Sequence, residues 1–112
     1  MSVKGKTAIV GLGVTSMGKI YGRSATDFAI EAVDLALQDA GLRREEVDGL
    51  LINANMSREM NPQLQEALGL ENLSLLNVMN AFGSTAGTML QYAAMAIENG
   101  LAHVIVLVYA DR

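Results

Sequence analysis

Short apolar runs alternate with segments of helical periodicity along the whole chain, and this order constrains the fold more than any other feature. The apolar runs, which predict buried strands, occupy residues 7–11, 49–54, 73–79 and 104–108. The segments with helical spacing occupy residues 24–40, 61–69 and 84–99. Strands that alternate with helices form βαβ units around a parallel sheet. The sequence therefore predicts a layered α/β fold, a partial βαβαβαβ with a mainly parallel sheet.

The ends of the predicted helices carry recognisable signals. Ser24 and Asp27 have the spacing of a capping box, and Gly41 fits the left-handed position after a helix. Asn61 and Pro62 fit the cap and first position of the short second helix. One face of the first helix carries its apolar residues, namely Ala29, Val33, Ala36, Leu37 and Ala40.

Composition excludes several classes of function. The eight Lys and Arg residues are scattered in a chain of net charge -4, whereas nucleic-acid binding needs a basic cluster. The absence of cysteine excludes disulfides, thiolate catalysis and cysteine-bound metals within this chain, and no metal site is expected. The longest apolar run, residues 104–110, is too short to span a bilayer, and residues 1–6 are too short and polar for a signal peptide. We expect a cytoplasmic protein.

The last predicted strand, residues 104–108, alternates so little that both of its faces should be covered. An α/β domain rarely stops directly after its most buried strand, because that strand needs a neighbour and a covering helix. We therefore expect residues 1–112 to be a single partial domain that belongs to something larger, or a subunit that borrows its missing cover.

A glycine turn follows the first predicted strand and invites comparison with dinucleotide-binding loops. Gly11 and Gly13 fit that motif, but the third glycine, Gly18, comes two positions too late. The motif also needs an acidic residue at the end of the second strand, where this chain has Asn53 and Asn55. A structural turn is the favoured interpretation.

The loop at residues 80–88, Asn-Ala-Phe-Gly-Ser-Thr-Ala-Gly-Thr, joins a predicted strand to a helix N-terminus. Free backbone N–H groups at such a terminus can bind a carbonyl oxygen or a phosphate. A purely structural interpretation is equally open. Ser84 or Thr85 would then only cap the helix, and Gly83 and Gly87 would allow tight packing of the helix on the sheet.

The order of these motifs resembles the thiolase superfamily, in particular thiolases of the sterol-carrier and lipid-transfer type. The resemblance rests on the loop at residues 80–88, the Ala-rich helix ending in Asn99-Gly100, and the strand at 104–108 followed by Tyr109-Ala110-Asp111-Arg112. It extends to residues 8–15, 39–42 and 47–50, and so covers nearly the whole chain. The resemblance implies the N-terminal half of a thiolase-like fold, with a mixed, mainly parallel sheet. It also implies an acyl-CoA thioester as substrate or ligand, with no other cofactor.

Carried onto this sequence, the family's nucleophilic cysteine falls on Gly83, which has no side chain to acylate. Ser84 is one position on, turned by about 100° around the helix, and lacks a base. The only histidine, His103, is expected at a strand edge, where a surface role is favoured over catalysis. No catalytic residue is therefore assigned, and the resemblance implies a substrate-facing loop of Asn80, Gly83, Ser84 and Thr85.

Three functions remain open. The chain could be part of a retro-aldolase subunit that cleaves acyl-CoA thioesters, because relatives without the cysteine do so beside a partner with an OB-fold. It could be a non-catalytic acyl-CoA-binding or structural subunit, associated with itself or with the missing thiolase half. It could also be a truncated, inactive product.

Overall fold

The computed structural model of the chain describes residues 7–15, 24–53, 62–79 and 85–109. The helices are α1 (Ala25–Ala40), α2 (Leu64–Leu68) and α3 (Thr85–Glu98), with a short 3-10 turn at Arg44–Glu46. The strands are β1 (Gly49–Asn53), β2 (Leu75–Met79) and β3 (Ile105–Val108).

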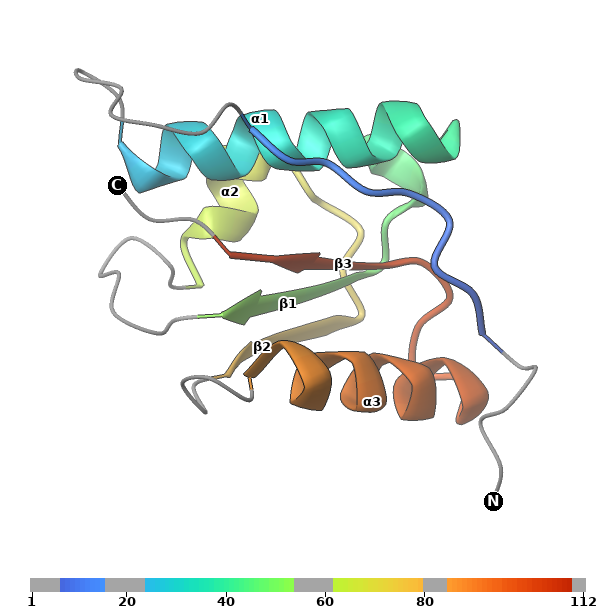
Figure 1. Cartoon of the computed structure of the whole chain (residues 1–112). Coiled ribbons are helices and arrows are strands. Elements are labelled where there is room, and N and C mark those ends of the chain that lie inside the picture. Colours follow the sequence, from blue (N-terminus) through green and yellow to red (C-terminus); the bar gives the residue numbers. More distant parts are fainter. Residues whose placement is uncertain (1–6, 16–23, 54–61, 80–84, 110–112) are drawn as a thin grey trace.

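The three strands form one parallel sheet with the order β2-β1-β3 (Figure 1). Gly49 at the start of β1 is in register with Leu75 of β2 and with Ile105 of β3. Because all three strands point the same way, their carboxyl ends meet at one edge of the sheet. The predicted α/β class with a mainly parallel sheet is confirmed.

Helices cover both faces of the sheet, with α1 and α2 on one side and α3 on the other (Figure 1). Successive residues of a strand point to opposite faces. Leu50 and Ile52 of β1 accordingly pack in the cluster on the α1 side, whereas Leu51 packs with Met89 and Ala93 of α3. Burying a side chain of this size contributes roughly 1.5–3 kcal/mol, so the central strand anchors both layers.

The predicted strand at residues 7–11 is wrong. Residues 7–15 have no regular secondary structure, and Figure 1 shows this blue segment running along α1. A Cβ on Gly13 would lie only 2.0 Å from the carbonyl oxygen of Ala32, so glycine lets the segment approach the helix backbone. The Leu12 N–H donates to Asp39 Oδ2 at 2.9 Å, so its donor is used on the helix and not in the sheet.

This placement leaves much of the segment's apolar surface in water. Four large apolar residues of the segment are between 62% and 77% exposed: Ile9, Val10, Leu12 and Val14. The pattern predicted a buried strand at this place. The sheet formed by the described residues has three strands instead of the four expected, and this segment is not paired with any of them.

The remaining elements fall close to their predicted positions. Ser24 caps α1 in a capping box with Asp27, and Gly41 follows in the left-handed region at φ 71°, as predicted. The second helix starts at Leu64 and not at Pro62, because the Pro62 carbonyl accepts from Gln65 in a tighter turn. Asn61 lies outside the described residues.

β3 has a helix on each side, as the sequence predicted. Ile105 and Leu107 pack toward α3, and Val106 and Val108 pack toward α1. Only Val108 is fully buried, because β3 forms an edge of the sheet. Within the described ranges, no helix is both long and apolar enough to cross a bilayer.

Candidate functional site

The predicted substrate-facing loop lies largely outside the described residues. This holds for Asn80, Gly83 and Ser84, whereas Thr85 is the first residue of α3. The described residues on either side agree with the predicted strand–loop–helix order, because β2 ends at Met79 and α3 begins at Thr85. The roles of these four residues stay predictions.

The loop is connected to the edge of the sheet where ligands bind in parallel α/β folds. Ligands of open parallel sheets bind outside the carboxyl ends of the strands. Here those ends are Asn53, Met79 and Val108, and α3 begins at the same edge. The first turn of a helix has backbone N–H groups without an intrahelical partner and a partial positive charge. This edge can therefore present hydrogen-bond donors to an anion or a polarised carbonyl oxygen.

Asn53 is a polar residue at this edge for which no role was predicted from the sequence. It ends the central strand and is in register with Met79. Its carboxamide oxygen, Oδ1, is buried and has no hydrogen-bond partner. Buried polar atoms in proteins are almost always paired, so this oxygen requires a reason. The signal in the sequence was a polar residue closing an otherwise apolar strand.

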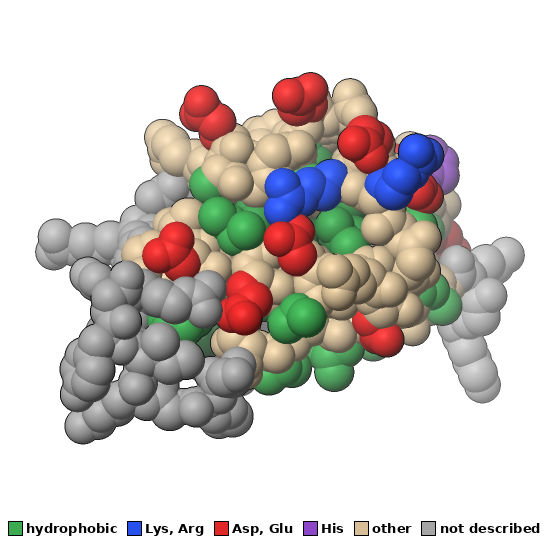
Figure 2. All heavy atoms as spheres, turned by 90° about the horizontal axis from the view of Figure 1, so that it is seen from above, with side chains coloured by type: hydrophobic (Ala, Val, Ile, Leu, Met, Phe, Trp, Pro, Cys, Tyr) green, Lys and Arg blue, Asp and Glu red, His purple; other side chains and the backbone are tan. Residues whose placement is uncertain are grey.

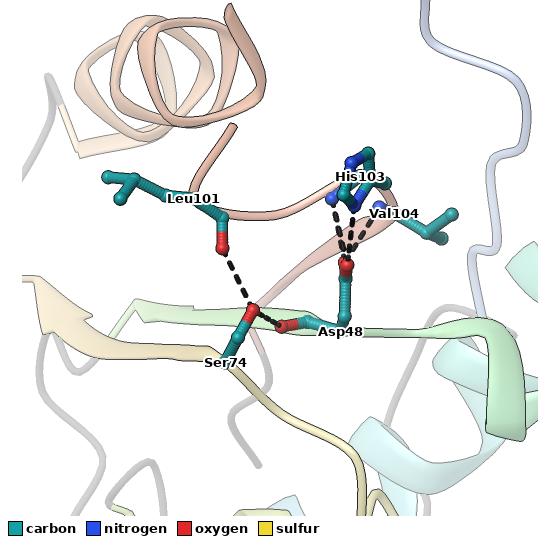
Figure 3. A network of polar contacts seen from close by, with 5 residues as sticks. All are labelled: Asp48, Ser74, Leu101, His103 and Val104. Carbon is teal, nitrogen blue, oxygen red and sulfur yellow. Dashed lines mark hydrogen bonds and ion pairs between the residues drawn. The ribbon is translucent and has the colours of Figure 1, made fainter. Parts of the chain in front are cut away.

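A second polar cluster lies at the opposite edge, where the strands begin (Figure 3). Asp48, one residue before β1, accepts hydrogen bonds from the N–H groups of His103 and Val104 at 2.9 and 2.8 Å. Its Oδ2 is also 3.1 Å from Nδ1 of His103. Ser74 donates to the Asp48 carbonyl at 3.2 Å and to the Leu101 carbonyl at 2.8 Å. These bonds join the segments that lead into all three strands.

Two opposing effects act on the pKa of Asp48. Partial burial raises its pKa, but the hydrogen bonds from Val104 and His103, together with the charge of His103, outweigh burial and hold the pKa below its ordinary value of 3.8. The carboxylate is therefore ionised at neutral pH. In this charged form it accepts the hydrogen bonds from the two N–H groups, and its role is structural.

His103 occupies the exposed position before β3 that the sequence predicted. Its side chain is 80% exposed and is paired with the carboxylate of Asp48. The described Ser74 is bonded to carbonyl oxygens and not to the imidazole, so the three residues do not form a relay from a base to a hydroxyl. The position at the amino ends of the strands also separates His103 from the carboxyl edge.

The other surface features of the described residues offer neither a metal site nor a pocket at the carboxyl edge of the sheet. Among the residues in the four described ranges, no group of three His, Cys, Asp or Glu side chains is arranged to hold a metal ion. One hollow of about 420 Å³ lies along α1 beside Glu31 and Asp34. Another of about 550 Å³ lies between α2 and Leu76 of β2. Neither is lined by Asn53.

Comparison with known sequences identifies relatives that match nearly all of this chain. The chain is 38% identical over 104 residues to a 17-hydroxy-3-oxo-4-pregnene-20-carboxyl-CoA lyase of Mycobacterium tuberculosis, a match that covers 93% of this chain and 27% of the relative. It is also 38% identical over 103 residues to a steroid side-chain-cleaving aldolase of Thermomonospora curvata, covering 91% of this chain and 26% of the relative. The chain thus spans about a quarter of the length of these relatives. No protein-family model matches it.

Comparison with solved structures identifies proteins that share the fold of this chain. The Ltp2-ChsH2(DUF35) aldolase aligns with a TM-score of 0.77 and 38% identity over 89% of this chain and 26% of its own. A monomeric SCP2-thiolase like protein of Mycobacterium smegmatis aligns with a TM-score of 0.71 and 18% identity over 88% of this chain and 22% of its own, which is evidence for the fold alone. The resemblance to thiolase-like proteins on which the sequence analysis relied is confirmed by the shared fold and by these relatives.

Proposed function

We propose that this chain is part of a retro-aldolase that cleaves a carbon–carbon bond in a β-hydroxyacyl-CoA thioester. The observation that carries the proposal is the 38% identity over 93% of the chain to a CoA-thioester lyase. The absence of cysteine agrees with it, because an acyl-enzyme route through the thiol of a thiolase requires that residue.

The reaction needs no covalent intermediate. A base removes the proton of the β-hydroxyl group, the bond between the α and β carbons breaks, and a carbonyl compound leaves. The electron pair remains on the CoA thioester as an enolate, which is then protonated at the α carbon. The developing negative charge lies on the thioester oxygen, so the main catalytic demand is for hydrogen-bond donors placed at that oxygen.

The first turn of α3 supplies donors of this kind. α3 begins at Thr85, at the carboxyl edge of the sheet, and its first backbone N–H groups have no partner within the helix. In our proposal these groups, together with Gly83 and Ser84, bind the thioester oxygen, and Asn80 contributes to the same loop. The acid and base come from polypeptide other than these 112 residues. Acyl-CoA is the ligand, and no further cofactor or metal takes part.

The chain acts in a larger assembly in this proposal. α3 contains one charged residue, Glu98, and exposes Leu90 and Met95 at 46% and 55%. α1 is different: acidic side chains are spread over its outer side, which Figure 2 shows from above. A helix face that is apolar and almost uncharged is typical of a surface that another protein segment covers. The similar solved structure, the Ltp2-ChsH2(DUF35) aldolase, is named for two components.

We propose that polypeptide equivalent to the remaining three quarters of the relatives covers α3. The resemblance implies association with a second copy or with an OB-fold subunit, and each would be a finer form of the same proposal. The cytoplasmic location stays a prediction.

A second candidate is a non-catalytic acyl-CoA-binding or structural subunit. The observation in its favour is that the single histidine lies at the amino edge, away from the start of α3, and bonds to Asp48. The described residues therefore bring no base to the carboxyl edge.

The test uses the protein purified from its own source, with whatever polypeptide accompanies it. Native mass spectrometry identifies the assembly, and the same preparation is incubated with a β-hydroxyacyl-CoA. We expect release of a carbonyl compound and a shortened CoA thioester in equal amounts, with the mass of this chain unchanged. An acyl adduct on the chain would contradict the retro-aldol route. Binding without cleavage would favour the non-catalytic subunit.

A further inference from the structure

The carboxamide of Asn53 is a buried polar group that the fold itself does not use. Its Oδ1 atom has no hydrogen-bond partner, although an unpaired buried acceptor costs about 1–3 kcal/mol. The strand backbone does not require this residue type, because the preceding residues of β1 are Leu50, Leu51 and Ile52. A leucine at position 53 would continue that series without an orphaned oxygen.

The position of Asn53 relates this oxygen to the start of α3. Leu51, two residues earlier, packs against Met89 and Ala93 of α3, and alternate strand residues share a face. Asn53 therefore lies on the α3 face of the sheet. Its register partner Met79 packs with the same cluster and is the last residue of β2.

An amide oxygen accepts a hydrogen bond and cannot act as a base at neutral pH, so its partner must be an N–H or O–H donor. A β-hydroxyacyl-CoA carries both kinds of donor, a hydroxyl on the acyl chain and two amide N–H groups in the pantetheine arm. A ligand at the carboxyl edge would bring one of them to this strand end, where ligands of parallel sheets bind.

We propose that Asn53 is a substrate-binding residue whose Oδ1 accepts a hydrogen bond from the acyl-CoA ligand. This inference rests on the proposed function, since it takes the ligand from there. It places a binding residue on the central strand, at the edge of the sheet where α3 begins. It also explains why an unpaired oxygen is retained: the partner arrives with the ligand.

The test compares Asn53→Leu with Asn77→Leu in the full chain in its native assembly. Asn77 is a half-buried asparagine of β2 on the same sheet face, in register with Leu51 and away from the strand ends. Calorimetric titration with 3-hydroxybutanoyl-CoA and with butanoyl-CoA measures affinity. Thermal unfolding without ligand measures stability.

We expect Asn53→Leu to weaken binding about 3- to 10-fold, the effect of one hydrogen bond, and to leave the ligand-free unfolding temperature unchanged or raised. Asn77→Leu should leave both affinities unchanged. A loss confined to 3-hydroxybutanoyl-CoA identifies the hydroxyl as the donor, and an equal loss for both thioesters identifies a pantetheine amide.

Two results would overturn the inference while the proposed function stands. One is wild-type affinity in Asn53→Leu. The other is a ligand-free unfolding temperature for Asn53→Leu clearly below that of Asn77→Leu, or failure of that variant alone to fold, because the carboxamide would then have a structural partner. If the wild-type assembly binds neither thioester, the proposed function fails and this inference fails with it.

Discussion

Replacing Asp48 by alanine tests whether one carboxylate holds the amino ends of the three strands together. The change leaves the N–H groups of His103 and Val104 without their acceptor. Val104 is half-buried, so water replaces its partner poorly, whereas His103 is exposed and recovers more of its bond. Leaving a partly buried donor unpaired costs about 1–3 kcal/mol. Since 1 kcal/mol corresponds to roughly 4–8 °C in a domain of this size, the unfolding temperature should fall by about 4 °C or more.

A matched variant separates the backbone contacts from the ion pair. His103→Ala removes the imidazole but keeps the N–H group that donates to Asp48. Because the His103 side chain is 80% exposed, its pairing with Asp48 is a surface interaction worth about 0–1 kcal/mol. We therefore expect His103→Ala to unfold within a few degrees of the wild type, measured by circular dichroism at pH 7. Equal losses in the two variants would refute this reasoning.

The pH dependence gives an independent check. The folded-state pKa of Asp48 is below its ordinary value, so its contribution to stability is fully present above about pH 4 and is lost as the pH falls through the folded pKa. Near pH 5 the difference in stability between wild type and Asp48→Ala should have its full value. Below about pH 4 it should shrink. A difference that grows as the pH falls from about 5 to about 3 would show that the sign of the pKa shift is wrong.

Three further changes have defined outcomes. Ser24→Ala removes the capping box of α1 and should lower the free energy of unfolding by about 1 kcal/mol in chemical denaturation; no change would mean that the cap is dispensable. Gly13→Leu places a Cβ 2.0 Å from the Ala32 carbonyl oxygen, so residues 7–15 should leave α1 and be cut faster by protease, while unchanged cleavage would place the segment elsewhere. Met95→Glu on the exposed face of α3 should change the stability of the chain by no more than about 0.5 kcal/mol but weaken its native assembly in size-exclusion chromatography. An intact assembly with this variant would remove α3 from the interface.

The agreement between the predicted and the observed elements differs from one element to the next. α1 was predicted closely because its determinants are local: Ser24 and Asp27 are three residues apart, and Gly41 follows directly. β1 and β3 were predicted because each is a compact apolar run between turn residues. Residues 7–11 have the same local pattern but do not form a strand. A segment becomes a strand only if another strand pairs with it, and that pairing is decided by distant parts of the chain.

The candidate site likewise has features that could be predicted from the sequence and one that could not. The residue types at 80–85 and the lack of cysteine are properties of the sequence, and they led to the thiolase resemblance and to a function without an acyl-enzyme. The unpaired oxygen of Asn53 could not be predicted, because whether a polar atom finds a partner depends on every group around it.

The sequence by itself determined the order of strands and helices from α1 onward, the caps of α1 and the exclusion of thiol chemistry, since these depend on residues close together or on composition. Only the tertiary structure decided that β1 lies between β2 and β3, and that Asp48 bonds to His103, 55 residues away. The physical reason is that parallel strands meet only through crossover connections. Which side chains come together at their ends is therefore set by the packing of the whole sheet.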